Sequence, residues 1–144
     1  MSPLAGAPAC AIQLVDGRIV TGKTGNFLGA SSAALLNALK ALGDIEDEID
    51  IISSSVIEPI QKLKTEHMGS VNPRLHTDEV LLSLAVSAVT NPVAKFAMDQ
   101  LGKLKGAQLH STVILSHVDE KTYKKLGVDV TYEPKRQNKT LYNA

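Results

Sequence analysis

Strand-type and helix-type segments alternate along the 144 residues of this chain. Short runs rich in valine and isoleucine predict strands, whereas apolar residues three and four positions apart predict helices. We predict strands at residues 10–15, 18–22, 49–52, 109–116 and 128–132. We predict helices at residues 31–42, 55–67, 78–90, 92–104 and 119–126, and the second of these has Pro59 as an alternative start. This order predicts an α/β fold in which helices cover both faces of a sheet, a three-layer α/β/α arrangement.

The pair Asp16 and Gly17 stands between the first two predicted strands. An Asp-Gly pair is a strong signal for a two-residue turn, because both turn residues must tolerate a positive φ. We therefore expect the sheet to open with a β-hairpin and to be mixed. Residues 1–9, rich in proline, glycine and alanine, predict a flexible lead-in. Residues 10–134 then form a single α/β domain, and residues 135–144 form a polar tail.

Charge and aromatic content exclude some classes of function. The 15 basic and 15 acidic residues give a formal net charge of +0, and only 3% of the residues are aromatic. Such a surface offers neither a positive field nor stacking rings, so we expect no nucleic-acid partner. The longest apolar run, at residues 80–89, is too short to span a membrane, so we expect no membrane partner. The single cysteine, Cys10, is typical of a reducing compartment and predicts a cytoplasmic protein.

The predicted helix at residues 78–90 is apolar nearly all round. Leu82, Leu84 and Val86 are among the side chains that leave it little polar face. A helix of this kind is normally buried on most sides. We therefore expect it at the centre of the core, with Thr77 as its N-terminal cap.

Residues 17–24, with the sequence GRIVTGKT, match the phosphate-binding formula G-x-x-x-x-G-K-[ST]. In such a site the four intervening residues wrap a phosphate, and a helix follows the lysine directly. Here those residues predict a strand, and a helix cap comes only at Ser31 or Ser32. We therefore interpret the match as accidental and expect no nucleotide binding.

A weaker hypothesis keeps this segment as a site for an isolated anion, because helix N-termini favour negative charge. The candidate anion-binding residues are Gly22, Lys23, Thr24, Ser31 and Ser32. The alternative is that the two serines only cap the helix.

A second group of polar residues lies at residues 72–79. Arg74, His76 and Glu79 are a set suited to general acid–base catalysis. The capping rules give a simpler interpretation, in which Thr77 is the cap and the acidic residues of the first turn face the helix dipole. We favour the capping interpretation and keep Arg74, His76 and Glu79 as candidate catalytic residues.

The two polar segments, residues 22–32 and 72–79, both lead into predicted helix starts. Ligand sites of open sheets gather at the loops beyond strand ends, so we expect the two segments to meet at one edge of the sheet. Lys23 and Arg74 would there favour a small anionic ligand, with His76 available for proton transfer.

Several stretches of the chain resemble one bacterial family. They are residues 17–24, 30–40, 58–64 (EPIQKLK), 72–81 (NPRLHTDEVL), 91–92 and 110–116 (HSTVILS). Together they resemble the C-terminal region of the uncharacterised protein family UPF0371, which carries the domain of unknown function DUF1846. The resemblance extends from about residue 11 to residue 142. It implies a longer family protein, in which a large α/β region precedes this part.

The resemblance also implies a fold similar to that of the cytidine deaminases. Deaminases hold zinc through a His or Cys, accompanied by a catalytic Glu, at the start of one helix, and through two cysteines at the start of the next. The corresponding starts here are GASSA at residues 29–33 and SSSVI at residues 53–57. The ligands and the catalytic carboxylate are missing, so we expect a deaminase-like fold with no zinc site, no other metal and no cofactor.

Three functions follow from these observations. The leading hypothesis is a partial-site or non-catalytic C-terminal module of a larger family protein, because no complete motif is present. The first alternative is an enzyme that acts on an anionic or phosphorylated small molecule. It would use Lys23, Arg74, His76 and Glu79. The second alternative is an interaction module that assembles homo-oligomers.

Overall fold

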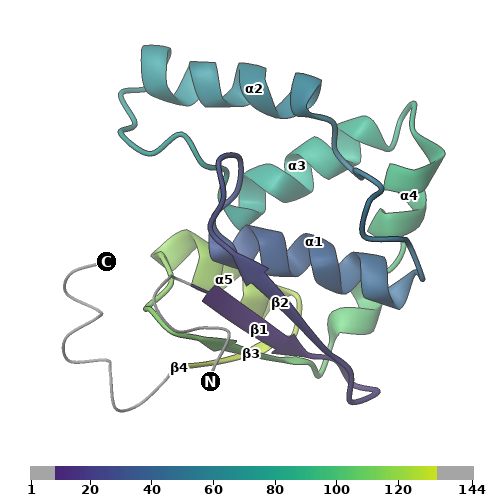
Figure 1. The fold of residues 1–144 in the computed structure, drawn as a ribbon. Helices are drawn as coiled ribbons and strands as arrows, with labels where there is room; N and C mark the ends of the chain where they lie inside the picture. The colour runs from purple at the N-terminus through teal and green to yellow at the C-terminus, as the bar shows by residue number, and fades with distance from the viewer. Residues whose placement is uncertain (1–8, 133–144) are drawn as a thin grey trace.

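The computed structural model describes residues 9–132, and its main elements follow in the order β1-β2-α1-α2-α3-α4-β3-α5-β4 (Figure 1). The predicted polar tail lies outside the described residues, as does all of the predicted lead-in except Ala9. Ala9 is the first residue of the first strand.

A four-stranded mixed sheet lies at the base of the fold. Its strands are β1 (Ala9–Gln13), β2 (Ile19–Lys23), β3 (Gln108–Ser111) and β4 (Asp129–Tyr132). Their spatial order is β2-β1-β3-β4; β1 is antiparallel to β2 and β3, and β3 is parallel to β4. The predicted opening hairpin is confirmed, and Gly17 in its turn has a φ of 94°, which glycine adopts without steric cost.

Five α-helices occur in the described residues. They are α1 (Ala30–Leu42), α2 (Ser54–Lys62), α3 (Thr77–Ser87), α4 (Pro92–Met98) and α5 (His117–Lys125). A π-helical segment, Leu63–His67, continues α2, and a 3₁₀ turn, Leu101–Leu104, follows α4. None of the helices in residues 9–132 has the length and apolar content that crossing a membrane requires.

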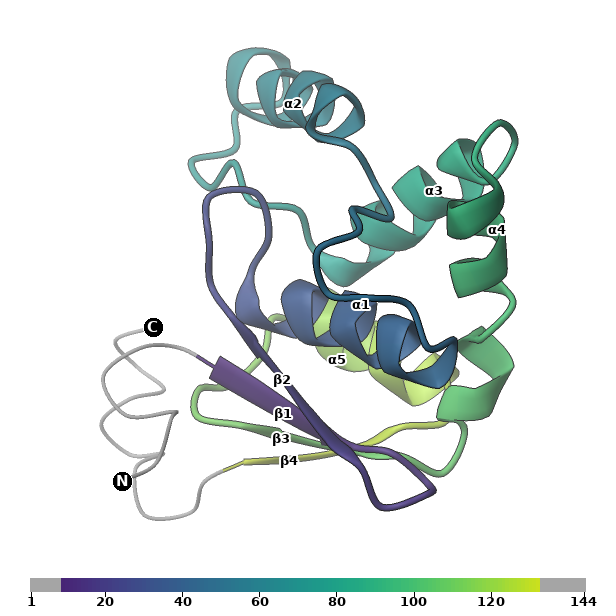
Figure 2. The ribbon, with the colours of Figure 1, turned by 45° about the vertical axis from the view of Figure 1, so that its right-hand side comes forward.

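The helices lie on one side of the sheet (Figures 1 and 2). α1 and α5 both pack on the strands, and a hydrogen bond between Ser31 and Asp119 joins them, so they occupy the same face. α3 and α4 contact α1 and lie beyond it, away from the sheet (Figure 2). The predicted three-layer arrangement, with helices on both faces, is therefore wrong for the described residues.

The residue pattern of β3 gives the physical reason. Leu109 and Ser111 are buried beneath the helices, whereas Gln108 is exposed and His110 is half-buried on the other face. A strand with one apolar and one polar face belongs to a sheet that is covered on one side. The alternation of strands and helices along the chain does not distinguish this case from a sheet covered on both sides.

The predicted strand at residues 49–52 is wrong. This segment is irregular backbone that leads toward α2, and it joins no sheet. Ile51 and Ile52 are nevertheless buried in the core. A short β-branched run indicates burial, and burial is common to central strands and to packed loops.

α3 differs from the prediction in its burial. Val80 and Leu84 are fully buried, but Leu82 and Val86 are 68% and 67% exposed. The expectation that this helix is buried on most sides is therefore wrong for the described chain. The predicted cap is also shifted, because Thr77 is the first helical residue and the N-cap position belongs to the residue before it.

Leu84→Ala and Leu82→Ala should differ in stability, although both remove the same atoms from the same helix. Leu84→Ala should lower the free energy of unfolding by about 2–5 kcal/mol, because it leaves a cavity in the core. Leu82→Ala should change it by less than about 0.5 kcal/mol, as is usual for a surface position. Urea denaturation of the two variants measures the difference, and equal losses would contradict the orientation of α3.

Candidate functional site

The first turns of α1, α3 and α5 meet at one buried carboxylate, that of Asp119. Ser31 Oγ in α1 donates to Asp119 Oδ2 at 2.8 Å. Thr77, at the start of α3, donates to Asp119 Oδ1 from its amide nitrogen at 2.9 Å and from its hydroxyl at 2.8 Å. All three residues are nearly closed to solvent. We name Asp119, Ser31 and Thr77 the Asp119 cluster.

The carboxylate of Asp119 is held in its charged form. Burial raises its pKa, but hydrogen bonds from Thr77 and Ser31 lower it further than burial raises it, so the pKa lies below its ordinary value. The ring of His76, when it is protonated, adds a favourable charge interaction, with Nδ1 3.6 Å from Asp119 Oδ2. The starts of α1 and α3 also present the positive ends of their helix dipoles. This point in the fold therefore favours a negative charge, and the protein supplies that charge itself.

α5 carries Asp119 and is fixed by two further contacts. Ser116 caps the helix, with its Oγ accepting a hydrogen bond from the amide of Asp119 at 3.1 Å. Tyr123, fully buried one turn later, donates its hydroxyl to the backbone carbonyl of Ser31. Burial raises the pKa of Tyr123 well above its ordinary value, so the phenol keeps the proton that it donates.

Cys10 lies in the core on β1, with 3.6 Å between its Sγ and the Oγ of Ser111. Burial raises the pKa of this thiol to about 11, against a smaller lowering by the contact with Ser111. A thiol that stays protonated at neutral pH is a weak nucleophile. Cys10 is therefore a packing residue.

Gly22 lies in a strand and not in a phosphate-binding loop. The residues Ile19–Lys23 pair with β1 along their whole length, and α1 begins only at Ala30. A Cβ added to Gly22 would lie 2.2 Å from the nitrogen of Ala34 and 2.7 Å from the oxygen of Ala30. Glycine is required here because the strand and the helix approach closely, so the match to the phosphate-binding formula has a packing explanation.

Ser31 and Ser32 are buried inside the first turn of α1. The predicted cap at Ser31 or Ser32 is wrong, because the helix already begins at Ala30. Their hydroxyls serve contacts between elements: Ser31 bonds Asp119, and Ser32 Oγ donates to the carbonyl of Leu75 at 2.9 Å. Both hydroxyls therefore already have a partner within the chain.

Lys23 and Thr24 are exposed at the end of β2. Within residues 9–132, no hydrogen bond or ion pair links either side chain to Ser31 or Ser32. The structure thus separates the five predicted anion-binding residues into a packing glycine, two exposed residues and two buried serines.

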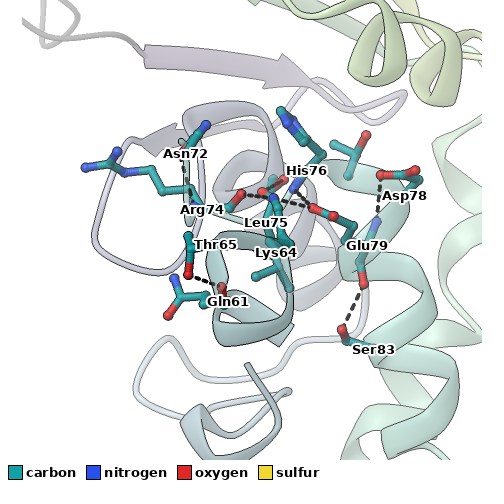
Figure 3. Close-up of polar contacts among 12 residues, drawn as sticks. Gln61, Lys64, Thr65, Asn72, Arg74, Leu75, His76, Asp78, Glu79 and Ser83 are labelled. Carbon is teal, nitrogen blue, oxygen red and sulfur yellow. Dashed lines mark hydrogen bonds and ion pairs between the residues drawn. The ribbon is translucent and has the colours of Figure 1, made fainter. Parts of the chain in front are cut away.

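Arg74, His76 and Glu79 are joined through a residue that was not predicted, Lys64 (Figure 3). Glu79 Oε1 accepts hydrogen bonds from the amide of His76 and from Lys64 Nζ, each at 2.8 Å. Lys64 Nζ also donates to the backbone carbonyl of Arg74 at 2.6 Å, and Lys64 is only 7% exposed. The three candidate catalytic residues are neighbours, but Glu79 is engaged in capping α3 and in an ion pair.

The two polar segments that were predicted to meet, residues 22–32 and 72–79, lie side by side. Leu28 and Leu75 form an isolated parallel bridge, and Arg74 Nε donates to a backbone carbonyl of the first segment. The predicted juxtaposition is therefore confirmed. What it creates is the Asp119 cluster; within the described residues, no hydrogen bond or ion pair joins Lys23 to Arg74 or His76.

Asp119 and Lys64 are the polar residues that sequence reasoning missed. A signal for Asp119 was present, because Ser116 precedes it by three residues, the spacing of a capping box. That pattern indicates a helix start but not its partners, which come from other helices. Lys64 gave no such signal, because its partners lie 10 and 15 residues further along the chain.

A shallow pocket of about 210 Å³ lies between α1 and the segment that leads into α2. Its lining is mostly apolar, and no predicted site residue contributes to it. Two of its polar side chains already bond backbone carbonyls: Asn37 donates to Thr21 at 2.7 Å, and Lys40 donates to Asp47 at 2.9 Å. The pocket is therefore separate from the Asp119 cluster.

Comparison with known proteins identifies the family. The chain matches the model described as Domain of unknown function DUF1846, C-terminal, over residues 2–142. The chain belongs to this family. UPF0371 proteins of Corynebacterium efficiens and Corynebacterium glutamicum are 61% and 57% identical to it, and one of Streptococcus pneumoniae is 48% identical. Each alignment extends over 137 residues, which are 95% of this chain and 28% of the relative. The chain thus spans little more than a quarter of the length of these UPF0371 relatives, and the resemblance inferred from sequence is confirmed.

Asp119→Asn should remove the negative charge on which α1 and α3 converge and replace one of the two accepting oxygens with an amide group that can only donate. It should lower the free energy of unfolding at pH 7 by about 2–3 kcal/mol, because a hydrogen bond to a charged group contributes about 1.5–3 kcal/mol. Since the folded-state pKa of Asp119 is depressed, its contribution is complete above about pH 5 and is lost as the pH falls through about 4 and below.

Urea denaturation of the wild type and of Asp119→Asn between about pH 7 and pH 2 should therefore show a gap that closes toward acid pH. Asp129→Asn, which changes an exposed carboxylate on β4, is the control and should follow the wild type. A gap of constant size across the range would mean that Asp119 does not act through its charge.

Gly22→Ala should destabilise the protein by at least about 2 kcal/mol, because the new methyl group would meet the backbone of α1. Gly25→Ala is the matched control: a Cβ there meets no atom within 4 Å, so stability should change by less than about 1 kcal/mol. Thermal or urea melts compare the two. A harmless Gly22→Ala would argue that this glycine is not required for packing.

Proposed function

We propose that this domain is a non-catalytic C-terminal module of a longer UPF0371 protein. The observation that carries the proposal is the Asp119 cluster, in which polar groups suited to ligand chemistry bond one another. Asp119 supplies the negative charge that the helix starts favour, and Glu79 is engaged by Lys64 and by the start of α3. The work of these residues is to hold helices in place.

The proportions of the relatives support the same proposal. The aligned part is 28% of the length of the Corynebacterium and Streptococcus proteins. Any active site of the longer protein would therefore draw on a region far larger than this domain. A module that contributes structure or part of a site to that region accounts for a domain without a complete motif.

We retain the deaminase-like fold as part of the proposal, without zinc chemistry. The opening hairpin followed by α1, and the parallel strands β3 and β4 connected by α5, support it. Residues 29–33 and 53–57 carry no zinc-binding side chain, and across residues 9–132 no three His, Cys, Asp or Glu residues are grouped to hold a metal ion. The buried free thiol of Cys10 supports a cytoplasmic location.

A second candidate function is favoured by one observation. The imidazole of His76 lies 3.6 Å from the carboxylate of Asp119, while its side chain is still 36% exposed. A histidine that lies beside a buried carboxylate and is open to solvent can take part in proton transfer. Such a site would act on a small anionic ligand. The side chain of Arg74 extends away from the imidazole and donates to the carbonyl of Gly25, so it would have to turn to contact that ligand (Figure 3).

Calorimetric titration of this chain with Mg-ATP and with inorganic phosphate separates the two candidates. The module proposal expects no saturable heat with either ligand, because the hydroxyls of Ser31 and Thr77 and the carboxylate of Glu79 already have partners. A dissociation constant of about 10 µM or tighter that is lost in His76→Ala would replace it with the second candidate. Lys103→Ala, at an exposed position of the 3₁₀ turn after α4 and outside every candidate site, is the control and should leave such binding unchanged.

A further inference from the structure

The outer face of α3 carries a stripe of three aliphatic side chains. Leu82 and Val86 lie in the helix, and Val89 follows in the turn after it. Spacings of four and three residues place such side chains along one side of a helix. Their exposures are 68%, 67% and 81%. We name these three residues the α3 stripe.

The opposite side of α3 is already used by the core, where Val80 and Leu84 are fully buried. A helix with apolar side chains on both sides is normally enclosed by protein. α5 shows the usual alternative, because its exposed positions include Lys121, Lys124 and Lys125. The α3 stripe thus has the composition of an interior surface and the exposure of an outer one.

α3 is positioned so that its outer face is open. It lies beyond α1 on the side away from the sheet (Figure 2). Its first residue, Thr77, is held by two hydrogen bonds to Asp119, so the rotation of the helix about its axis is fixed. A surface that is held rigid before contact loses little conformational entropy when a partner binds.

We infer that the α3 stripe is the docking surface for the part of the UPF0371 protein that lies outside this domain. The inference rests on the proposed function as a module of a longer protein. In the relatives, 28% of the length aligns with this chain, so nearly three quarters of the protein is available to cover the stripe. A segment rich in aliphatic side chains is the chemistry that fits, because the three exposed residues offer no charge and no hydrogen-bonding side chain.

The size of the stripe favours a partner in the same polypeptide over a second copy of the domain. Three aliphatic side chains cover on the order of a few hundred Å². A stable interface between separate chains buries roughly 1,200 Å² or more in total. A covalently connected partner is present at a high effective concentration, so a small apolar contact is sufficient.

Cysteine labelling tests the inference with a closely matched pair. Val86→Cys lies in the stripe and Val15→Cys lies in the β1–β2 turn, and both native side chains are 67% exposed. Cys10 gives little background, because it is fully buried and burial raises its pKa to about 11. The rate of maleimide labelling at each site is measured by mass spectrometry in this chain. It is then measured at the aligned positions of the full-length Corynebacterium efficiens relative.

The two cysteines should label at similar rates in this chain. In the full-length relative, the labelling rate at the position of Val86 should be at least about tenfold lower than the rate at the position of Val15. An unchanged ratio would overturn the inference, because the stripe would then be open to solvent in the complete protein. Protection of Val86→Cys that already appears in this chain and grows with its concentration would also overturn it, in favour of a second copy.

The result is independent of the test of the proposed function. Ligand binding lost in His76→Ala would overturn the non-catalytic proposal without changing the labelling ratio. Conversely, an unchanged labelling ratio with no ligand binding would leave the module proposal in place and remove only the α3 stripe as its docking surface.

Discussion

The carboxylate of Asp119 is the interaction on which the arrangement of the helices depends. Burying a charge is costly unless hydrogen bonds compensate for the lost water, and Ser31 and Thr77 supply those bonds from two other helices. α1 follows β2, at one edge of the sheet, and α5 connects β3 to β4, at the other. The bonds of one carboxylate therefore fix the helices of both halves of the sheet against each other.

The same interaction explains why residues with catalytic potential are found in structural roles. Helix N-termini attract anions, and a fold that brings the starts of α1 and α3 together creates a place for negative charge. Here a side chain of α5 fills that place. Glu79 is used in a similar way, since it accepts from the amide of His76 and pairs with Lys64. Ligand binding and helix capping both use carboxylates, hydroxyls and free helix amides. In this domain, the carboxylates of Asp119 and Glu79 are already bonded to helix starts.

The features that could be predicted from the sequence are those determined by a few neighbouring residues. The hairpin follows from Asp16 and Gly17, which are sufficient to form the turn. The Asp119 cluster could not be predicted in this way, because its donors lie 42 and 88 residues from Asp119 in the sequence. The local pattern also explains why Thr77 was expected to cap its own helix, because a threonine before an apolar run indicates a cap. The sequence does not show that its hydroxyl donates a hydrogen bond to a carboxylate of α5.

The burial of α3 depends on both a local pattern and this distant contact. Its sequence is apolar on two sides, but the helix can turn only one of them toward α1. Rotating α3 to bury Leu82 and Val86 would expose Val80 and Leu84 and would withdraw Thr77 from Asp119, leaving a buried charge with fewer partners. The hydrogen bonds at the start of the helix thus determine which apolar side faces outward. The α3 stripe is exposed within residues 9–132, and it is this apolar side that we infer to contact the rest of a longer UPF0371 protein.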